Sequence, residues 1–376
     1  MSDVPHLRFP EFSGEWEETT LGKISEITKG SGISKDQLSE QGSPCILYGE
    51  LYTKYKSEII DVVYSRTELE SSSLVKSKAN DVIIPCSGET AIDISTARCV
   101  PFNNILLGGD LNIIRLKHDD GGFFAYQLNG ARKKDIARVA QGVSVVHLYG
   151  ENLKHIRVYH PAIEEQKKIT RLLSLMDERI ATQNKIIEDL KLLKSAIAET
   201  VFNNMKGHLT NLSAICNIVK GKQVNGEELS EKGKYYVMNG GMTPSGYYDQ
   251  CNTPANTISV SEGGNSCGYV QYNKSSFWSG GHCYTLQDIT SGVDTQYLFH
   301  YLKRYESNIM NLRIGTGLPN IQKKDLENFR ITLPPSNVQK EISTCLTAIE
   351  DKIIVEVKWL DSAQKERLYL LRQMFI

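Results

Sequence analysis

The sequence predicts an α+β fold in which two related mixed α/β domains are separated by an antiparallel two-helix coiled coil. Three observations predict it: the chain repeats itself, short apolar runs are bounded by turn residues, and two long stretches carry apolar residues every three or four positions. A length of 376 residues is enough for two such domains with linking elements.

The internal repeat gives the chain an approximate two-fold symmetry. Leu21–Gly30 aligns with Leu212–Gly221 at an offset of 191 residues (212 minus 21). From Gly142, which aligns with Gly315, to the end of the chain the offset is 173. The second copy is therefore 18 residues shorter (191 minus 173), and the loss lies in its middle. Two copies that align at their ends but differ in their middle segments are typical of a scaffold specialised for two ligands.

Each copy begins with a mixed domain and ends with a long helix. Apolar runs such as Val82–Ile84 and Ile258–Val260 are flanked by Gly, Asn and Asp, which is typical of strands and turns. Shorter helices are expected at Phe123–Arg138 and Tyr297–Asn311. Ser336–Gln339 predicts a capping box at the start of the second long helix. The expected boundaries are residues 1–160 and 207–333 for the mixed domains, and residues 161–206 and 334–376 for the long helices.

Both long helices show the 3.5-residue apolar period of a coiled-coil seam. Polar residues interrupt the two seams at matching positions, Gln183 with Glu356 and Lys194 with Arg367. Residues 166–204 span about 58 Å as a helix, so two packed helices make a stiff bar between the domains. The predicted seam residues are Ile169, Leu173, Met176, Ile180, Ile187, Leu190, Ile197, Val201, Ile342, Leu346, Ile349, Ile353, Leu360 and Leu370.

The composition argues against several classes of protein. A formal net charge of −1 counts against a DNA-binding protein that relies on its own positive surface, so a DNA role requires local patches or partners. The eight cysteines form no CxxC pair, so the zinc-finger spacings are absent. A chain of this size does not need disulfides, which favours reduced thiols. The sequence shows no signal peptide and no apolar run of membrane-spanning length, so we expect a cytoplasmic protein.

Motifs for catalysis are missing from the sequence. It contains no GxxxxGKS/T phosphate loop and no GxSxG, HExxH or GxGxxG motif. His147, His155 and His160 do not have the spacing of a metal site. We therefore expect a protein that is not an enzyme, with no catalytic residue, no metal and no cofactor bound by this chain.

Three segments resemble the specificity subunits of type I restriction–modification systems. They are Leu7–Glu17, Gly315–Leu326, and Ile331–Pro335 with the helix that follows it. The first copy departs from the pattern at Gly142–Leu148, which contains no proline. The resemblance covers the whole chain and implies two target-recognition domains, each reading one half of a bipartite DNA site.

The same resemblance implies a set of partners. It implies binding to double-stranded DNA and to two methyltransferase subunits, which flip and methylate an adenine in each half-site with S-adenosylmethionine. It also implies binding to motor–nuclease subunits that use ATP and magnesium. These cofactors are expected on the partner subunits, no membrane is involved, and partners that enclose the DNA would compensate for the net charge of this chain.

Candidate DNA contacts are polar side chains in loops beside strands, where glycine lets the backbone approach phosphate. Arg, Asn and Gln can pair with the edges of guanine or adenine, whereas Lys more often contacts phosphate. In the first domain the candidates are Lys29, Tyr48, Tyr52, Lys54, Ser87, Arg98, Gln141, Ser144 and His147. In the second domain they are Lys220, Lys222, Asn239, Ser261, Asn265, Tyr269, His282, Arg313, Thr316 and Asn320.

Two other functions stay open at this point. One is a coiled-coil scaffold whose domains bind proteins, and the other is an autonomous DNA-modifying enzyme. The missing motifs argue against the enzyme, and methylation of DNA by the pure chain would favour it. Sequence-dependent DNA binding in the presence of a methyltransferase subunit would separate the specificity subunit from the scaffold.

Overall fold

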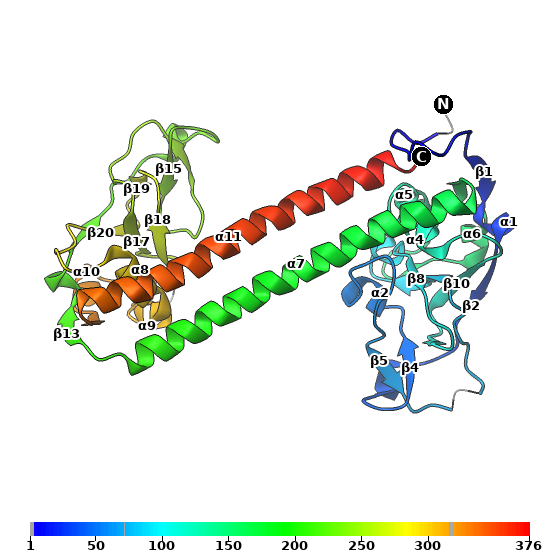
Figure 1. The fold of residues 1–376 in the computed structure, drawn as a ribbon, viewed down its shortest axis with the longest axis horizontal. Coiled ribbons are helices and arrows are strands. Elements are labelled where there is room, and N and C mark those ends of the chain that lie inside the picture. The colour runs from blue at the N-terminus through cyan, green and yellow to red at the C-terminus, as the bar shows by residue number, and fades with distance from the viewer. Residues whose placement is uncertain (1–3, 71, 316, 318) are drawn as a thin grey trace. The chain divides into compact units, whose positions relative to one another are not determined.

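A computed structural model of the chain describes residues 4–70, 72–315, 317 and 319–376. These residues form two compact units (Figure 1). Unit 1 comprises the chain up to Asn184 together with Lys358–Ile376, and unit 2 comprises Lys185–Val357. Each unit contains one mixed domain and a segment of each of two long helices, α7 (Ile163–Asn204) and α11 (Ser336–Gln373).

The domain of unit 1 is built on a four-stranded antiparallel sheet in the order β2-β10-β6-β8. Successive residues of the central strands point to opposite faces: Val82, Ile84 and Ile114 enter one core, whereas Ile83 and Ile113 enter a second core. Both faces of the sheet are covered, which explains the continuous apolar runs in the sequence. Two smaller sheets consist of β1 with β12 and of β7 with β11, and a third has the strand order β3-β5-β4-β9. The elements are β1 (Glu17–Thr20), α1 (Leu21–Ile24), β2 (Ser25–Lys29), β3 (Leu38–Ser39), β4 (Ser43–Ile46), α2 (Glu50–Thr53), β5 (Ser65–Thr67), β6 (Asp81–Pro85), β7 (Ser87–Gly88), α3 (Ala91–Ile94), β8 (Arg98–Val100), β9 (Leu106–Leu107), β10 (Leu111–Leu116), α4 (Gly121–Asn129), α5 (Lys133–Val139), β11 (Val146–His147), α6 (Gly150–Lys154) and β12 (Arg157–His160).

The domain of unit 2 repeats this sheet in the order β14-β20-β17-β18. Ile258 and Val260 of β17 share a core with Leu298 of helix α8. Helices α4 and α8 both begin at an aspartate, Asp120 and Asp294, whose carboxylate accepts a backbone N–H three residues on, at 2.8 and 2.7 Å. The elements are β13 (His208–Asn211), β14 (Asn217–Lys220), β15 (Tyr235–Met238), β16 (Gly246–Tyr248), β17 (Thr257–Ser261), β18 (Val270–Asn273), β19 (Trp278–Ser279), β20 (Cys283–Gln287), α8 (Thr295–Arg304), α9 (Glu306–Met310), α10 (Lys323–Glu327) and β21 (Arg330–Leu333).

Each mixed domain has two short helices where the sequence predicts one. Gly130 ends α4 with a backbone conformation outside the helical region (φ −95°, ψ −98°), and α5 begins at Lys133. Glycine has a low helix propensity, which accounts for this break. In unit 2, Tyr305 separates α8 from α9.

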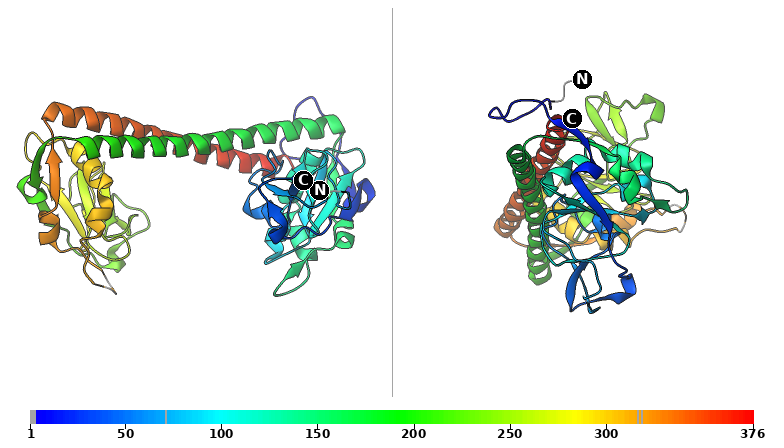
Figure 2. Two further views of the ribbon diagram at one scale, coloured as in Figure 1. Left: turned by 90° about the horizontal axis from the view of Figure 1, so that it is seen from below. Right: turned by 90° about the vertical axis from the view of Figure 1, so that its right-hand side faces the viewer.

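In each unit, segments of α7 and α11 run along one side of the mixed domain in opposite directions (Figure 2). In unit 1, Ile169 and Leu173 near the start of α7 share a core with Phe375, which follows the end of α11. In unit 2, Phe202 near the end of α7 shares a core with Leu346 in the first half of α11. The predicted fold class is therefore confirmed, and every predicted seam residue is buried or half-buried.

The start of each long helix is tied to the mixed domain by a glutamine. The Gln166 side chain accepts the backbone N–H of Asp120 at 2.9 Å and donates to the carbonyl of Pro161 at 2.9 Å. Gln339 makes the same two bonds in unit 2, with the N–H of Asp294 and the carbonyl of Pro334, each at 2.9 Å. Gln339 thus binds the loop before α8, and the predicted capping box, in which its side chain would reach back to the helix start, is wrong.

The polar seam position Arg367 lies in a cluster of charged side chains in unit 1. Its guanidinium contacts the carboxylates of Asp177 on α7 and of Glu58 in the mixed domain. The hydroxyl of Tyr126 also donates to Asp177, at 2.7 Å. Burial raises the pKa of the Glu58 carboxyl, and the positive charge of Arg367 opposes that rise. The cluster fastens the last part of α11 to the rest of unit 1.

Unit 2 contains the repeat-related version of this ion pair. Lys194 of α7 pairs with Glu350 of α11 at 3.2 Å. Lys194 and Glu350 are related to Arg367 and Asp177 by the same offset of 173 residues. The matching breaks Lys194 and Arg367 are therefore the cationic halves of two equivalent ion pairs between the helices.

Replacing Arg367 by alanine is expected to lower the free energy of unfolding by about 3 kcal/mol, because two buried carboxylates lose their cation. The measurement is urea denaturation followed by circular dichroism. Lys365→Ala is the control, since Lys365 forms only an exposed pair with Asp361 at 2.6 Å and its loss should cost under about 0.5 kcal/mol. Equal effects of the two substitutions would show that the Arg367 cluster does not stabilise unit 1.

Candidate nucleic-acid interface

In unit 1 several strand ends and loops meet at one edge of the central sheet, the edge at which strands β2 and β6 end. Strands β2 and β6 both run antiparallel to β10, so their carboxyl ends lie at the same edge. Lys29 ends β2, and Ser87 follows β6. Ser31, just after β2, forms a bridge with Gly108, which brings the end of β9 to the same place. This edge therefore brings the predicted contacts Lys29 and Ser87 together.

A hairpin extends this edge. Strands β7 and β11 pair so that Ser87 lies opposite His147. Gln141 and His147 exchange two backbone hydrogen bonds of 2.9 and 2.7 Å. Gly142 has a φ of +118°, which L side chains rarely adopt, and it permits the turn. The predicted contacts Gln141, Ser144 and His147 are all exposed on this hairpin.

A cleft of about 1130 Å³ opens beside the same edge, with Gly108 in its wall. Three predicted contacts, Tyr48, Tyr52 and Lys54, also line it. Burial raises the pKa of the Tyr52 hydroxyl, so the group stays neutral and can donate a hydrogen bond. The Lys54 ammonium donates to the buried carboxylate of Glu50 at 2.6 Å, so the protein itself already holds that charge.

The prediction that Arg98 contacts DNA is wrong. The residue is only 7% exposed. Its guanidinium donates to the backbone carbonyls of Leu51 at 3.0 Å, Tyr55 at 2.8 Å and Ser57 at 2.8 Å. Arg98 therefore anchors a segment of the chain onto β8 and faces away from solvent.

The corresponding edge of unit 2 contains a buried carboxylate, Glu262, which the sequence analysis did not single out. Lys220, the last residue of β14, pairs with one oxygen of Glu262 at 2.6 Å, and Nδ1 of His282 lies 3.5 Å from the other. The hydroxyl of Tyr284 donates to Glu262 at 3.1 Å. The amide oxygen of Asn239 accepts the backbone N–H of His282 at 3.1 Å. Two predicted contacts, Lys220 and His282, thus lie beside Glu262, and a third, Asn239, binds the backbone of His282.

A loop that includes Asn320 borders the same edge. Asn320 forms a bridge with Gly263, next to Glu262, and exchanges backbone hydrogen bonds of 2.8 and 3.0 Å with Ile314. The exposed predicted contacts of unit 2 are Lys220, Lys222, Asn265, His282, Arg313 and Asn320. Thr316, also predicted, lies outside the described residues.

Two further predicted contacts of unit 2 have partners within the domain. Ser261 is 4% exposed, and its hydroxyl donates to the carbonyl of Gly240 at 2.6 Å. Tyr269 is half-buried, and the ammonium of Lys303 on α8 lies 3.9 Å from the centre of its ring. The prediction for Ser261 is wrong, because its hydroxyl is buried and bonded within the domain. The contact of Tyr269 with DNA stays a prediction.

Backbone hydrogen bonds identify the residue of unit 1 that corresponds to Glu262. The N–H of Glu262 donates to His282 at 2.9 Å, and its carbonyl accepts from Ile321 at 2.8 Å. Cys86 makes the same two bonds, each at 2.7 Å. Burial raises the pKa of the Cys86 thiol to about 11, so it is a neutral group where unit 2 has a carboxylate. The two domains thus share a fold but carry chemically different side chains at equivalent positions.

Thiols and potential metal ligands are distributed unevenly. Six of the eight cysteines are buried, and the two exposed ones, Cys251 and Cys345, both belong to unit 2. Within the described residues there is no cluster of three or more side chains of the kinds that bind metal ions. Across the same part of the chain, no helix combines the length and the apolar character needed to cross a membrane.

The two related domains thus carry different polar side chains at equivalent edges. A sequence profile described as the type I restriction modification DNA specificity domain matches residues 13–192 and 209–361. The chain belongs to this family.

Relatives carry the same description. A putative type I specificity subunit of Mycoplasma pneumoniae is 33% identical over 283 residues, which cover 71% of each chain. A putative type I specificity subunit of Mycoplasma genitalium is 29% identical over 182 residues, 46% of this chain and 47% of that protein. The putative MjaX specificity subunit of Methanocaldococcus jannaschii is 25% identical over 280 residues, 65% of this chain and 64% of that protein. The chain thus spans about half and just under two thirds of the length of the last two relatives.

Solved structures share the fold. A crystal structure of a type I restriction–modification S subunit from M. genitalium matches with a TM-score of 0.77 over 99% of both chains, at 20% sequence identity. A structure from work on complex assembly and conformational transition of the type I system matches with a TM-score of 0.53 at 16% identity, over 96% of this chain and 97% of the other.

Replacing Arg98 by alanine is expected to lower the free energy of unfolding by about 3 kcal/mol, because three backbone carbonyls lose their donor. Thermal and urea unfolding measure the change. Lys29→Ala is the matched control, since Lys29 is exposed at the sheet edge and its removal should change stability by less than about 0.5 kcal/mol. An Arg98→Ala chain as stable as the Lys29→Ala chain would contradict the anchoring role.

Proposed function

We propose that this chain is the DNA sequence-specificity subunit of a type I restriction–modification complex, in which each mixed domain reads one half of a bipartite DNA site. The observation that carries the proposal is the pair of equivalent sheet edges with different polar side chains. Unit 1 has Tyr48 and His147 at the repeat positions where unit 2 has Asn239 and Asn320. Edges with different hydrogen-bonding groups suit two different base sequences.

The side chains at each edge have distinct proposed roles. Lys29 and Lys220 are exposed at the ends of equivalent strands and suit phosphate contacts, which add affinity without sequence preference. Asn320 is exposed and carries an amide that can pair with an adenine edge, whereas the amide oxygen of Asn239 already accepts the backbone N–H of His282. Glu262 is buried, so its role is to hold Lys220 and His282 in place beside the DNA.

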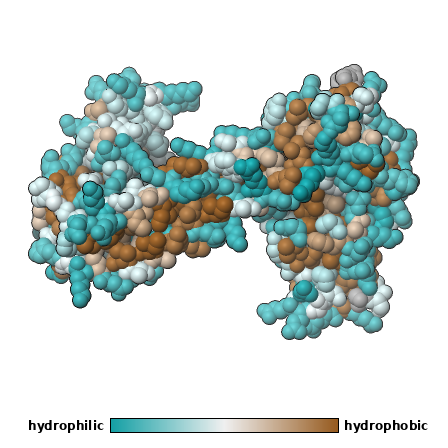
Figure 3. All heavy atoms as spheres, viewed as in Figure 1, coloured by the Kyte–Doolittle hydropathy of each residue, from teal (hydrophilic) through white to brown (hydrophobic). Residues whose placement is uncertain are grey.

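The long helices are the proposed site for the methyltransferase subunits. Their outer faces carry apolar side chains that remain exposed, and Figure 3 shows apolar atoms along the helices of unit 2. Exposed apolar residues along a helix are typical of a surface that binds a partner helix. In unit 1 these residues are Leu175, Leu368 and Tyr369. In unit 2 they form a helix surface that comprises Ile186, Leu192, Leu193, Ile354, Val355 and Val357.

The helices also have a proposed role in spacing. Helix α7 is continuous from Ile163 to Asn204 and has residues in both units. Since an α-helix rises a fixed distance per residue, its length can set the spacer between the two half-sites.

The chemistry is assigned to the partners. Methyltransferase subunits would bind S-adenosylmethionine, and motor–nuclease subunits would bind ATP and magnesium, while this chain acts as a non-catalytic recognition subunit. A net charge of −1 fits a subunit that encloses DNA together with partners supplying positive surface. A complex that acts on chromosomal DNA places the chain in the cytoplasm.

Exchange of one domain should change one half of the DNA site. Replacing residues 21–150 by the corresponding residues of another family member is expected to alter one half-site and leave the other half-site and the spacer unchanged. Long-read sequencing of DNA methylated by the assembled complex measures this. The matched control replaces the repeat-related residues 212–323 and should alter only the opposite half-site. If either exchange altered both half-sites, the two domains would not read DNA independently.

Replacing Lys29 by alanine should weaken DNA binding equally on all sequences. One lost phosphate contact lowers the slope of log affinity against log salt concentration by about 0.9. Fluorescence anisotropy of the assembled complex at four or more salt concentrations measures the slope. Lys365→Ala on α11 removes an equal charge from the helix and should leave the slope unchanged. A Lys29→Ala complex with the parental slope would exclude a phosphate contact at this position.

A further inference from the structure

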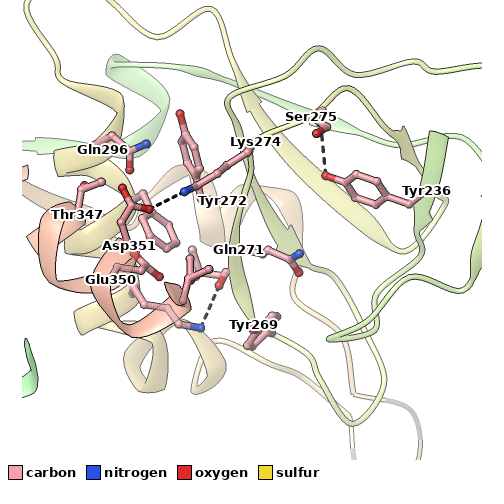
Figure 4. A pocket seen from close by; sticks show the side chains of 14 residues that line it. Tyr236, Tyr269, Gln271, Tyr272, Lys274, Ser275, Gln296, Thr347, Glu350 and Asp351 are labelled. Atoms are coloured by element: carbon pink, nitrogen blue, oxygen red, sulfur yellow. Dashed lines mark hydrogen bonds and ion pairs between the residues drawn. The ribbon is translucent and has the colours of Figure 1, made fainter. Parts of the chain in front are cut away.

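Unit 2 contains a pocket of about 390 Å³ between strand β18 and helices α8 and α11 (Figure 4). Its walls combine the aromatic rings of Tyr236, Tyr269, Tyr272 and Phe299 with polar and charged side chains. The function proposed above does not use this pocket. Its position beside the outer strand of the sheet indicates what can fill it.

Among the described residues, no further strand pairs with the outer edge of β18 at the pocket. Strand β18 is the outer strand of the order β14-β20-β17-β18. The backbone groups of Val270 point outward, because its N–H donates to Glu306 at 2.8 Å and its carbonyl accepts from Lys303 at 3.0 Å. Backbone groups of alternate residues in a strand point to the same side, so those of Tyr272 also point outward, toward the pocket that Tyr272 lines.

The equivalent strand of unit 1, β8, does not have an open edge. Ala97 corresponds to Val270, and side chains hold the backbone groups of both residues: those of Ala97 bind Asn129, each at 2.8 Å. The two strands differ at the next outward residue. Two residues on, Cys99 donates its N–H to Glu58 at 2.8 Å and accepts from Ile60 at 3.0 Å. The segment 58–60 therefore lies along β8 as an added strand.

The segment that covers β8 comes from the part of the repeat that is longer in unit 1. Arg98 holds this stretch by three backbone carbonyls between residues 51 and 57. Strand register places Gln271 at the position of Arg98, because Gln271 pairs with Ser259 as Arg98 pairs with Ile83. The Oε1 atom of Gln271 is buried and has no hydrogen-bond partner among the described residues. The pocket thus occupies the place that a covering segment fills in unit 1.

We infer that an extended segment of a methyltransferase subunit binds in this pocket as an added strand on β18. The inference rests on the proposed function, which assigns the helix surface to that subunit. Ile354 belongs to the helix surface and also lines the pocket, so a partner docked on α11 reaches the pocket directly. The segment would pair its backbone with Tyr272, place an apolar side chain among the aromatic rings, and donate a hydrogen bond to Gln271.

The test compares two substitutions at one position of the full chain. Tyr272→Pro removes the outward N–H, whereas Tyr272→Ala removes the same ring and keeps the N–H. An outer strand tolerates proline where its N–H faces away from the sheet. Calorimetric titration with the cognate methyltransferase subunit should show about tenfold weaker binding for the proline chain than for the alanine chain. Equal affinities of the two chains would overturn the inference.

Hydrogen exchange on the unmodified chain gives a second readout that does not depend on how the substituted chains fold. Binding of the methyltransferase subunit should slow exchange in residues 269–275 as well as along α11. Slowing on α11 without slowing in residues 269–275 would overturn the added strand and leave the proposed function intact. Slowing that grows with the concentration of this chain alone would assign the pocket to a second copy instead. Absence of any complex would overturn the proposed function and this inference together.

Discussion

The contact on which unit 1 depends is the buried cluster of Arg367 with Asp177 and Glu58. It joins three separate stretches of the chain: the end of α11, the first half of α7 and the mixed domain. Removing the cation between two buried carboxylates is strongly destabilising, because it leaves two negative charges without a partner and with little solvent around them. Apolar packing alone tolerates small shifts of one helix along another, whereas this cluster specifies one register.

Both copies of the repeat contain an ion pair between the long helices, but the number of carboxylates differs. Lys194 and Glu350 form a single pair in unit 2, while Arg367 holds two carboxylates in unit 1. The guanidinium has several donors in a fixed plane, so it can satisfy two acceptors where an ammonium satisfies one well. The third group in unit 1, Glu58, comes from the segment that unit 2 lacks. The loss of 18 residues from the second copy therefore also explains the simpler ion pair.

The frame of the molecule could be predicted from the sequence because it follows from periodicity. The 3.5-residue apolar period found the helix seam, and the matching breaks at Lys194 and Arg367 pointed to equivalent positions before their partners were known. Polar side chains inside a domain leave no such signal. Arg98 and Ser261 are polar residues of the kinds that often contact ligands at a surface, and only the fold shows that their partners are internal. Glu262 could not be singled out from the sequence, because a single carboxylate in a glycine-rich loop shows no periodicity or motif spacing.

The distribution of thiols has a practical consequence for spectroscopy. All the cysteines of unit 1 are buried, while unit 2 exposes Cys251 in its mixed domain and Cys345 on α11. A thiolate is the reactive form of cysteine, and burial keeps the inner thiols protonated and shielded. A maleimide dye added to the native protein would therefore attach to unit 2 alone. With Cys345 changed to serine, a single fluorophore would report on the second domain without any cysteine having to be introduced.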